Sequence, residues 1–301
     1  MSHQNAQQEK TTAALSSVLA AVGLTSFKII IGIMTNSLGI LAEESHSALD
    51  LVAALMTFFA VRVADKPADK EHPFGHGKAE NLSALFETVL LLATSAWIIY
   101  EAIHRLTAAE THVEVSFWSF LVMATSIVVD FSRSRILRNA AKKHNSQALE
   151  ADALHFSTDI WSSSVVILGL VGVVVGLRVP TLAFLEKADA VAALGVAVIV
   201  IYVSGELGVR TIQALLDSAP REDPEKIKAL VEAIPGVVNC HAVRMRPSGA
   251  NWFIDLHATV DGNMSVNQAH GLTETIEAEI HKIVSRADIT VHIEPLEMAE
   301  T

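Results

Sequence analysis

The sequence has a single cysteine, Cys240, which excludes a disulfide framework within the chain and any metal cluster held by thiolates alone. Charged residues are also few, at 18% of the 301 residues, where soluble domains carry about a quarter. The net charge of -11 lacks the basic excess that phosphate binding needs, so we expect no nucleic-acid partner. No cleavable signal peptide is visible, because "MSHQNAQQEKTTAAL" is polar before the first apolar run.

Apolar residues are abundant, at 51% of the total, and the mean hydropathy is +0.40. They gather in six stretches, each near the ~20 residues that a helix needs to cross a bilayer core. We therefore expect an all-α transmembrane domain of six helices over residues 1–210, with the lipid bilayer as a partner. The stretches are residues 12–34, 38–63, 82–105, 115–137, 148–177 and 188–210. The second and fourth connections with the adjoining stretch ends, residues 62–80 and 133–144, contain nine Lys and Arg residues, against Arg105, Arg178 and Lys187 around the third and fifth. This bias places both termini in the cytoplasm.

A different pattern follows "LLDSAP", residues 215–220. Residues 211–301 are predicted to form a cytoplasmic module with a helix to about residue 234, strands at 238–247 and 251–260, a helix at 265–285 and a last strand, "DITVHIEP". Pro235-Gly236 and Asp261-Gly262 are turn signals. The order αββαβ favours a small α+β sandwich.

Two of the apolar stretches carry the same pair of polar residues. "HSALD" contains His46 and Asp50, and "HFSTD" contains His155 and Asp159. Residues at i and i+4 lie on one helix face, so two such faces together offer two imidazoles and two carboxylates, a ligand set that suits Zn²⁺. A lone intramembrane histidine more often hydrogen-bonds a neighbouring helix. An aspartate at the helix centre, however, costs about 2.5 to 3.5 kcal/mol to insert and usually marks an ion pathway. The repetition at identical spacing favours an ion site.

Weaker candidates lie outside these stretches. The loop "KPADKEHPFGHGKAE" holds Asp69, His72 and His76, which could converge on one ion or belong to an ordinary solvated turn. Histidines on a small sandwich are usually surface residues, although His292 and Glu294 share one side of an alternating strand. The candidates of the cytoplasmic module are His241, His257, His270, His292 and Glu294.

Four other residues have simpler interpretations. Glu87 and Asp130 fit buried polar contacts between helices and are not predicted as ligands. Asp152 lies close to a helix start, where the macrodipole favours an anion. Cys240 points to the strand face opposite His241, which suits a core residue.

Four motifs, "SHSALDL", "HPFGHGKAE", "ADALHFSTDIW" and "LLDSA", together resemble the cation diffusion facilitators. The resemblance covers nearly the whole chain and implies a Zn²⁺/H⁺ antiporter of the bacterial inner membrane, with six helices, a metallochaperone-like cytoplasmic domain and a homodimer formed through that domain. It assigns the transport site to His46, Asp50, His155 and Asp159, the loop site to Asp69, His72 and His76, and the cytoplasmic site to His241, His257, His270, His292 and Glu294. Bacterial zinc and iron efflux members of the family have an aspartate where this chain has His46, and the exchange favours Zn²⁺.

The sequence thus predicts proton-coupled efflux of Zn²⁺ by alternating access, with Zn²⁺ also as a structural or regulatory ion. A transporter of the same family that prefers Fe²⁺, Mn²⁺ or Cd²⁺ is an alternative. Two other classes also stay open: an intramembrane zinc-dependent enzyme, although the chain lacks an HExxH motif, and a membrane metal sensor.

Overall fold

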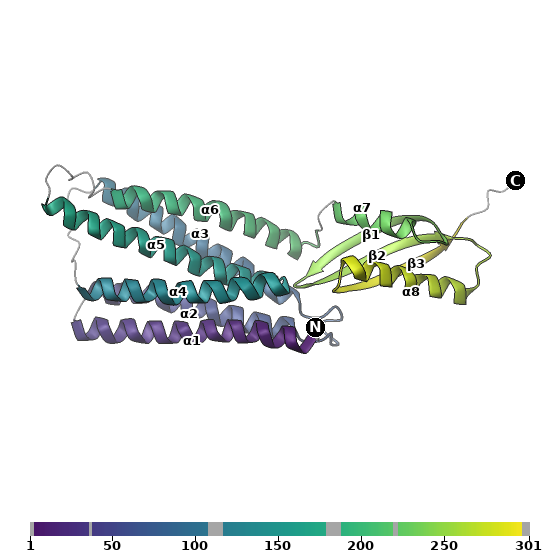
Figure 1. Ribbon diagram of the computed structural model, residues 1–301, viewed down its shortest axis with the longest axis horizontal. Helices are drawn as coiled ribbons and strands as arrows, with labels where there is room; N and C mark the ends of the chain where they lie inside the picture. The colour runs from purple at the N-terminus through teal and green to yellow at the C-terminus, as the bar shows by residue number, and fades with distance from the viewer. Residues whose placement is uncertain (1–2, 36–37, 108–116, 179–187, 219–221, 297–301) are drawn as a thin grey trace. The chain divides into compact units, whose positions relative to one another are not determined.

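The computed structural model describes residues 3–35, 38–107, 117–178, 188–218 and 222–296 (Figure 1). The chain divides into two compact units, Met1–Thr211 and Ile212–Thr301. Over the described residues, the first unit is a bundle of six long helices: α1 (His3–Thr35), α2 (Leu38–Ala64), α3 (Lys78–Thr107), α4 (Phe117–His144), α5 (Gln147–Arg178) and α6 (Ala188–Leu215), whose last turn belongs to the second unit.

Each predicted apolar stretch falls within one helix, apart from residues 115 and 116, which lie outside the described residues. α1 begins well before its apolar stretch, and α4 ends well after its own. Once a helix is nucleated, adding further residues at its ends is favourable even where they are polar. Among the described residues, three helical segments are long and apolar enough to cross a membrane: Asn5–Ile31, Lys78–His104 and Ala193–Leu215. Composition alone therefore supports three of the six predicted spans. In α4, Asp130 and Arg133 interrupt the apolar run.

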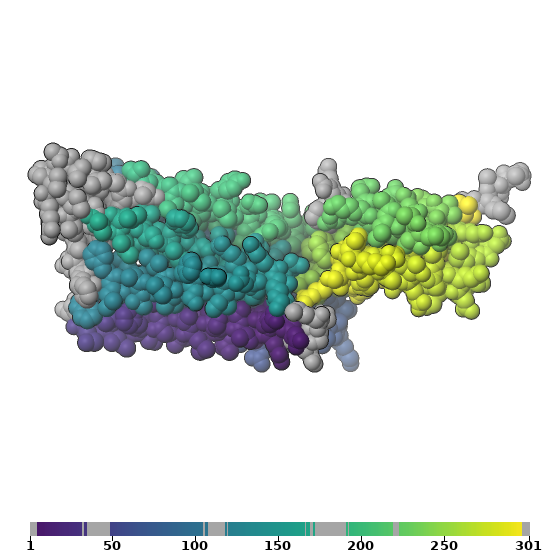
Figure 2. All heavy atoms as spheres, in the orientation of Figure 1, coloured from purple at the N-terminus to yellow at the C-terminus, as the bar shows by residue number. Residues whose placement is uncertain are grey.

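Small side chains let the helices of the first unit approach closely. α1 packs against α2 and α4, α4 packs against α5, and α3 packs against α2 and α5. Figure 2 shows α1 (purple) and α4 (teal) lying side by side. Ala14 of α1, Ala148 of α5 and Leu137 of α4 share one buried cluster with Phe156. Close backbone approach through small residues is the usual packing of membrane helices.

The second unit has the predicted order αββαβ over the described residues: α7 (Glu222–Glu232), β1 (Val237–Ser248), β2 (Asn251–Val260), α8 (Val266–Ile283) and β3 (Ala287–Pro295) (Figure 1). β1 pairs antiparallel with β2, and β2 pairs parallel with β3. A parallel pair needs a crossover connection, which α8 supplies. α8 begins with a capping box formed by Ser265 and Gln268.

The core of this unit lies between one face of the sheet and the two helices. Ile254, Leu256 and Ala258 alternate along β2 and are fully buried, together with Ile276 of α8. Cys240 is buried in the same core, which confirms its prediction as a core residue. The intervening residues of the strands point to the opposite face of the sheet.

Candidate metal centre

A buried group of three ionisable side chains lies where α2 packs against α5. Asp50 comes from α2, and His155 and Asp159 come from α5, one helical turn apart. His155 Nε2 lies 3.0 Å from Asp50 Oδ1 and 3.6 Å from Asp159 Oδ2. The His155 side chain is 3% exposed, against 14% for Asp50 and 17% for Asp159. One ligand atom from each residue lies within 4.8 Å of the others, so a single small cation could contact all three.

The predicted fourth member, His46, lies in α2 one turn before Asp50, but its side chain falls outside the described part of the structure. The described donors are therefore one imidazole and two carboxylates. Two largely buried carboxylates carry more negative charge than one imidazolium can neutralise, and burial of uncompensated charge is costly. A divalent cation that accepts nitrogen and oxygen ligands fits this donor set.

Glu87 of α3 contacts the same site, a connection that the sequence interpretation missed. Its side chain is fully buried. Glu87 Oε2 lies 3.6 Å from His155 Nδ1, and Thr57 of α2 donates a hydrogen bond of 3.4 Å to Glu87 Oε1. The residue is a buried polar contact between helices, as predicted, but its partner is a candidate ligand. No local spacing links positions 87 and 155, so the sequence contained no signal for this pair.

A second buried network lies beside the site. The Ser17 hydroxyl of α1 donates to Asp152 Oδ2 at 3.3 Å and accepts from Arg133 of α4 at 3.2 Å. Arg133 also donates to Asp130 of its own helix at 3.2 Å, and its guanidinium carbon lies 3.4 Å from the centroid of the Phe156 ring. Asp152 thus has a tertiary role that its position near a helix start did not predict, and Asp130 is a buried polar residue, as predicted.

The loop between α2 and α3 brings together its three predicted ligands. Asp69 Oδ1 accepts from the backbone N–H of His72 at 2.7 Å and of Glu71 at 3.0 Å. Asp69 Oδ2 lies 3.3 Å from His76 Nε2. The ring centroids of His72 and His76 are 4.3 Å apart. The backbone N–H of His72 lowers the pKa of Asp69. Gly75 takes a φ of 76° at the turn, a left-handed conformation that glycine adopts at little cost. These contacts keep the Asp69 carboxylate charged and close to both histidines.

Three histidines of the cytoplasmic module form a row across the open face of the sheet. In the strand register His241 pairs with His257, and His257 pairs with His292. Glu294 Oε1 lies 2.8 Å from His257 Nδ1, and Glu294 Oε2 lies 3.1 Å from His241 Nε2. His292 Nε2 is 3.8 Å from Glu294 Oε1, at the edge of this group. The alternation of β3 therefore places His292 and Glu294 on one side, as predicted.

The fifth predicted ligand, His270, is not part of this group. It lies on α8 with its side chain 74% exposed, and its Nε2 is 3.7 Å from Glu274 Oε1 on the same helix. Within this unit, α8 packs its Ile276 and Ile280 into the core. A histidine on the solvent side of that helix does not reach the histidine row.

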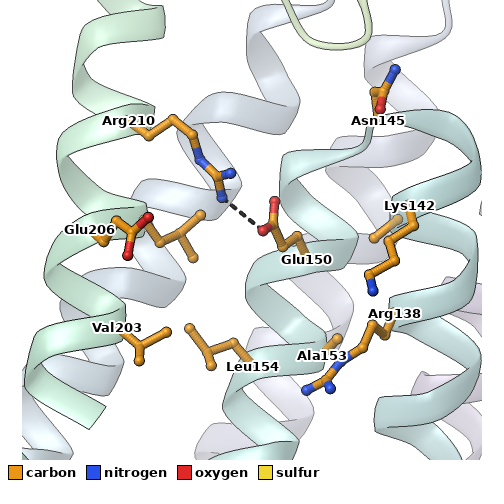
Figure 3. Close-up of a pocket in the computed structure, with 11 residues that line it drawn as sticks. Arg138, Lys142, Asn145, Glu150, Ala153, Leu154, Val203, Glu206 and Arg210 are labelled. Atoms are coloured by element: carbon orange, nitrogen blue, oxygen red, sulfur yellow. Dashed lines mark ion pairs between the residues drawn. The ribbon is translucent and has the colours of Figure 1, made fainter. Parts of the chain in front are cut away.

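A cavity of about 490 Å³ lies among α4, α5 and α6 (Figure 3). Arg210 Nη2 and Glu150 Oε1 form an ion pair of 2.8 Å at one end of it. Arg138, Lys142 and Glu206 also line the cavity, so its cations outnumber its carboxylates. The local charge disfavours a divalent metal, in contrast to the three acidic and histidine-containing groups above.

Comparison with known proteins covers both units. A family model described as the cation efflux transmembrane domain matches residues 14–216, and one described as the cytoplasmic domain of cation efflux proteins matches residues 219–296. The cation-efflux pump FieF of Pectobacterium atrosepticum is 32% identical over 291 residues, which cover 95% of this chain and 93% of the pump. FieF of Cronobacter sakazakii is 33% identical over 284 residues, which cover 94% of this chain and 92% of that pump. Among solved structures, the metal-bound C-terminal domain of the CzcD transporter from Thermotoga maritima is 40% identical, covers 27% of this chain and all of that domain, and has a TM-score of 0.25.

Proposed function

This chain belongs to the cation efflux family, and from that premise we propose that it exports Zn²⁺ across a bacterial inner membrane in exchange for protons. The family and its named relatives make it a membrane transporter of cations and not an enzyme. The observation that carries the proposal is the meeting of Asp50 with His155 and Asp159 between α2 and α5. Ionisable groups inside membrane helices are expensive, and transport sites explain their presence.

Zinc is proposed over Fe²⁺, Mn²⁺ and Cd²⁺ because of the donor atoms. Imidazole suits zinc, carboxylate-rich shells suit harder cations such as Mn²⁺, and soft thiolates are absent from the described groups. We assign His46 as a fourth ligand, one turn from Asp50, which would complete a shell of two nitrogens and two oxygens.

Proton coupling follows from the same ligands. Metal binds neutral imidazole and ionised carboxylate, so binding releases protons and protonation releases the metal. Histidine has a reference pKa of about 6.5 and exchanges protons within a physiological gradient. Alternating access then takes up Zn²⁺ on the cytoplasmic side and exchanges it for protons on the other.

The test uses the full chain in vesicles with an imposed pH gradient, a fluorescent zinc reporter and a pH reporter inside. We expect His155→Ala and Asp159→Asn to lower Zn²⁺ flux at least about tenfold, because each removes a ligand. His104→Ala is the matched control, since His104 is an exposed histidine of α3. Zinc flux at the parent rate in both site variants would overturn the proposed site, and zinc flux without proton movement would overturn antiport.

The remaining sites are assigned to regulation. We propose that residues 1–210 transport the ion, and that residues 211–301 form a cytoplasmic homodimer whose assembly Zn²⁺ strengthens at His241, His257 and Glu294, with His292 beside them. Both termini then lie in the cytoplasm, and the loop with Asp69, His72 and His76 binds a further ion. Sedimentation of the full chain in detergent tests this: zinc should increase the dimer fraction of the parent protein but not of His257→Ala. An equal response of both proteins would refute the assignment.

A further inference from the structure

Glu87 is a buried carboxylate in the middle of α3 that the proposed ligand set does not include. Its side chain has no exposed surface. A carboxylate inside a membrane helix is costly, and in such a position it usually faces a functional site or a partner charge. The residue that it faces is His155, with Glu87 Oε2 3.6 Å from His155 Nδ1. The pair is an ionic contact, and over the described residues neither of these two atoms has a hydrogen-bond partner.

The two nitrogens of His155 face different groups. Nε2 lies 3.0 Å from Asp50 and 3.6 Å from Asp159, on the side of the candidate ion site. Nδ1 faces Glu87 on the other side. A neutral imidazole carries one N–H and one lone pair. Without a cation, Asp50 at Nε2 is the nearer of the two carboxylate acceptors. When a cation occupies Asp50 and the Nε2 lone pair, the proton belongs at Nδ1, where Glu87 is the acceptor.

The other carboxylate oxygen of Glu87, Oε1, accepts a hydrogen bond that holds the side chain in place. The Thr57 hydroxyl of α2 lies 3.4 Å from Glu87 Oε1, and Ser83 of α3 lies 3.4 Å from that hydroxyl. All three side chains are buried. Because α3 packs against both α2 and α5, Glu87 connects the helix that carries Asp50 with the helix that carries His155. One oxygen is thus anchored to α2, and the other is directed at α5.

We propose that Glu87 is a positioning residue of the transport site, which holds His155 in the Nδ1–H tautomer and presents its Nε2 to the transported cation. The inference rests on the proposed function. Metal-binding histidines generally donate their second N–H to a carboxylate, a carbonyl or water, and loss of such a partner typically lowers metal affinity or activity by about 10- to 100-fold. A purely structural contact would hold the helices together without selecting a tautomer.

The first test measures zinc transport by Glu87→Ala and Glu87→Gln in vesicles. Glu87→Ala removes the acceptor, and we expect the KM for Zn²⁺ to rise about 10- to 100-fold with a smaller change in kcat. Glu87→Gln retains a carbonyl oxygen that can accept from Nδ1–H, so its KM should lie between those of Glu87→Ala and the parent. Ser95→Ala is the matched control, because Ser95 is another fully buried polar residue of α3 and its hydroxyl has no hydrogen-bond partner over the described residues.

The second test reads the tautomer directly, without metal. The method is nitrogen-15 NMR of the histidine-labelled full chain at pH 8, with the His155 signal assigned by its loss in His155→Gln. The Nδ1–H fraction should be larger in the parent than in Glu87→Ala, because Glu87 competes for the proton with Asp50, the nearer acceptor at Nε2. An unchanged tautomer with a parental KM would overturn the inference, as would a KM shift equal to that of Ser95→Ala. If the parent moves no zinc, the proposed function fails, but the tautomer measurement still decides whether Glu87 orients His155.

Discussion

Replacement of Lys10 with methionine should destabilise the first unit by about 3 to 5 kcal/mol, because it leaves a buried carboxylate without its counter-ion. Lys10 of α1 is 1% exposed, and its Nζ lies 2.8 Å from Glu80 Oε1 at the start of α3, where Glu80 is also 1% exposed. The same Nζ lies 2.7 Å from Asp65 Oδ1, just after α2, where the side chain is 18% exposed. Asp65 can turn toward solvent when the lysine is lost, whereas Glu80 cannot. Most of the penalty therefore comes from Glu80.

The assay is equilibrium unfolding in mixed micelles, followed by far-UV circular dichroism. The double variant Lys10→Met/Glu80→Gln should recover most of the lost stability, because an uncharged pair of similar volume often matches a buried ion pair. Lys143→Met is the matched control. It removes a lysine of α4 that pairs with Glu9 of α1 at an exposed position, where ion pairs contribute little. The reasoning is refuted if Lys10→Met is as stable as Lys143→Met, or if the double variant is no more stable than Lys10→Met.

Three further predictions concern the loop and the cytoplasmic module. Gly75→Ala should speed hydrogen exchange of the loop amides roughly 5-fold. Alanine at the positive φ of this turn destabilises the loop by about 1 kcal/mol. Exchange at the parental rate would contradict this. Burial raises the pKa of the Cys240 thiol, so less of the reactive thiolate is present at any given pH. A maleimide at pH 8 should therefore label Cys240 only after denaturation, and rapid labelling of the folded protein would count against the buried position. Glu294→Gln should weaken zinc binding in calorimetric titrations of the full chain by about tenfold or more, because it removes the charge between His241 and His257. Glu279→Gln, on the exposed side of α8, is its control and should bind zinc as the parent does.

Local periodicity predicted much of this protein. Residues four apart share a helix face, so His155 and Asp159 could be paired from the sequence, and residues two apart share a strand face, so His292 and Glu294 could be paired as well. The loop ligands were predictable for a similar reason, since Asp69 and His76 are close in sequence and glycine allows the turn between them. In each of these cases the contact joins residues that are close in the sequence, and the geometry of one element or one turn determines it.

Contacts between distant elements were not predictable in this way. α1 begins at His3, within the polar segment that precedes the first apolar stretch, and it buries Lys10. His270 was grouped with the other four cytoplasmic candidates, but the solvent side of α8 keeps it away from them. Both features concern the orientation of a whole helix, which depends on what packs against it.

The sequence by itself determined the helices, the cytoplasmic αββαβ pattern and the i, i+4 pair of His155 and Asp159, because each depends on hydropathy and on the repeat of one element. Only the tertiary structure decided how closely Asp50 approaches His155 and that Glu87 faces the other nitrogen of the same ring. It also decided that Glu294 contacts both His241 and His257. These contacts join residues from different helices or strands, and the packing of those elements sets the distances.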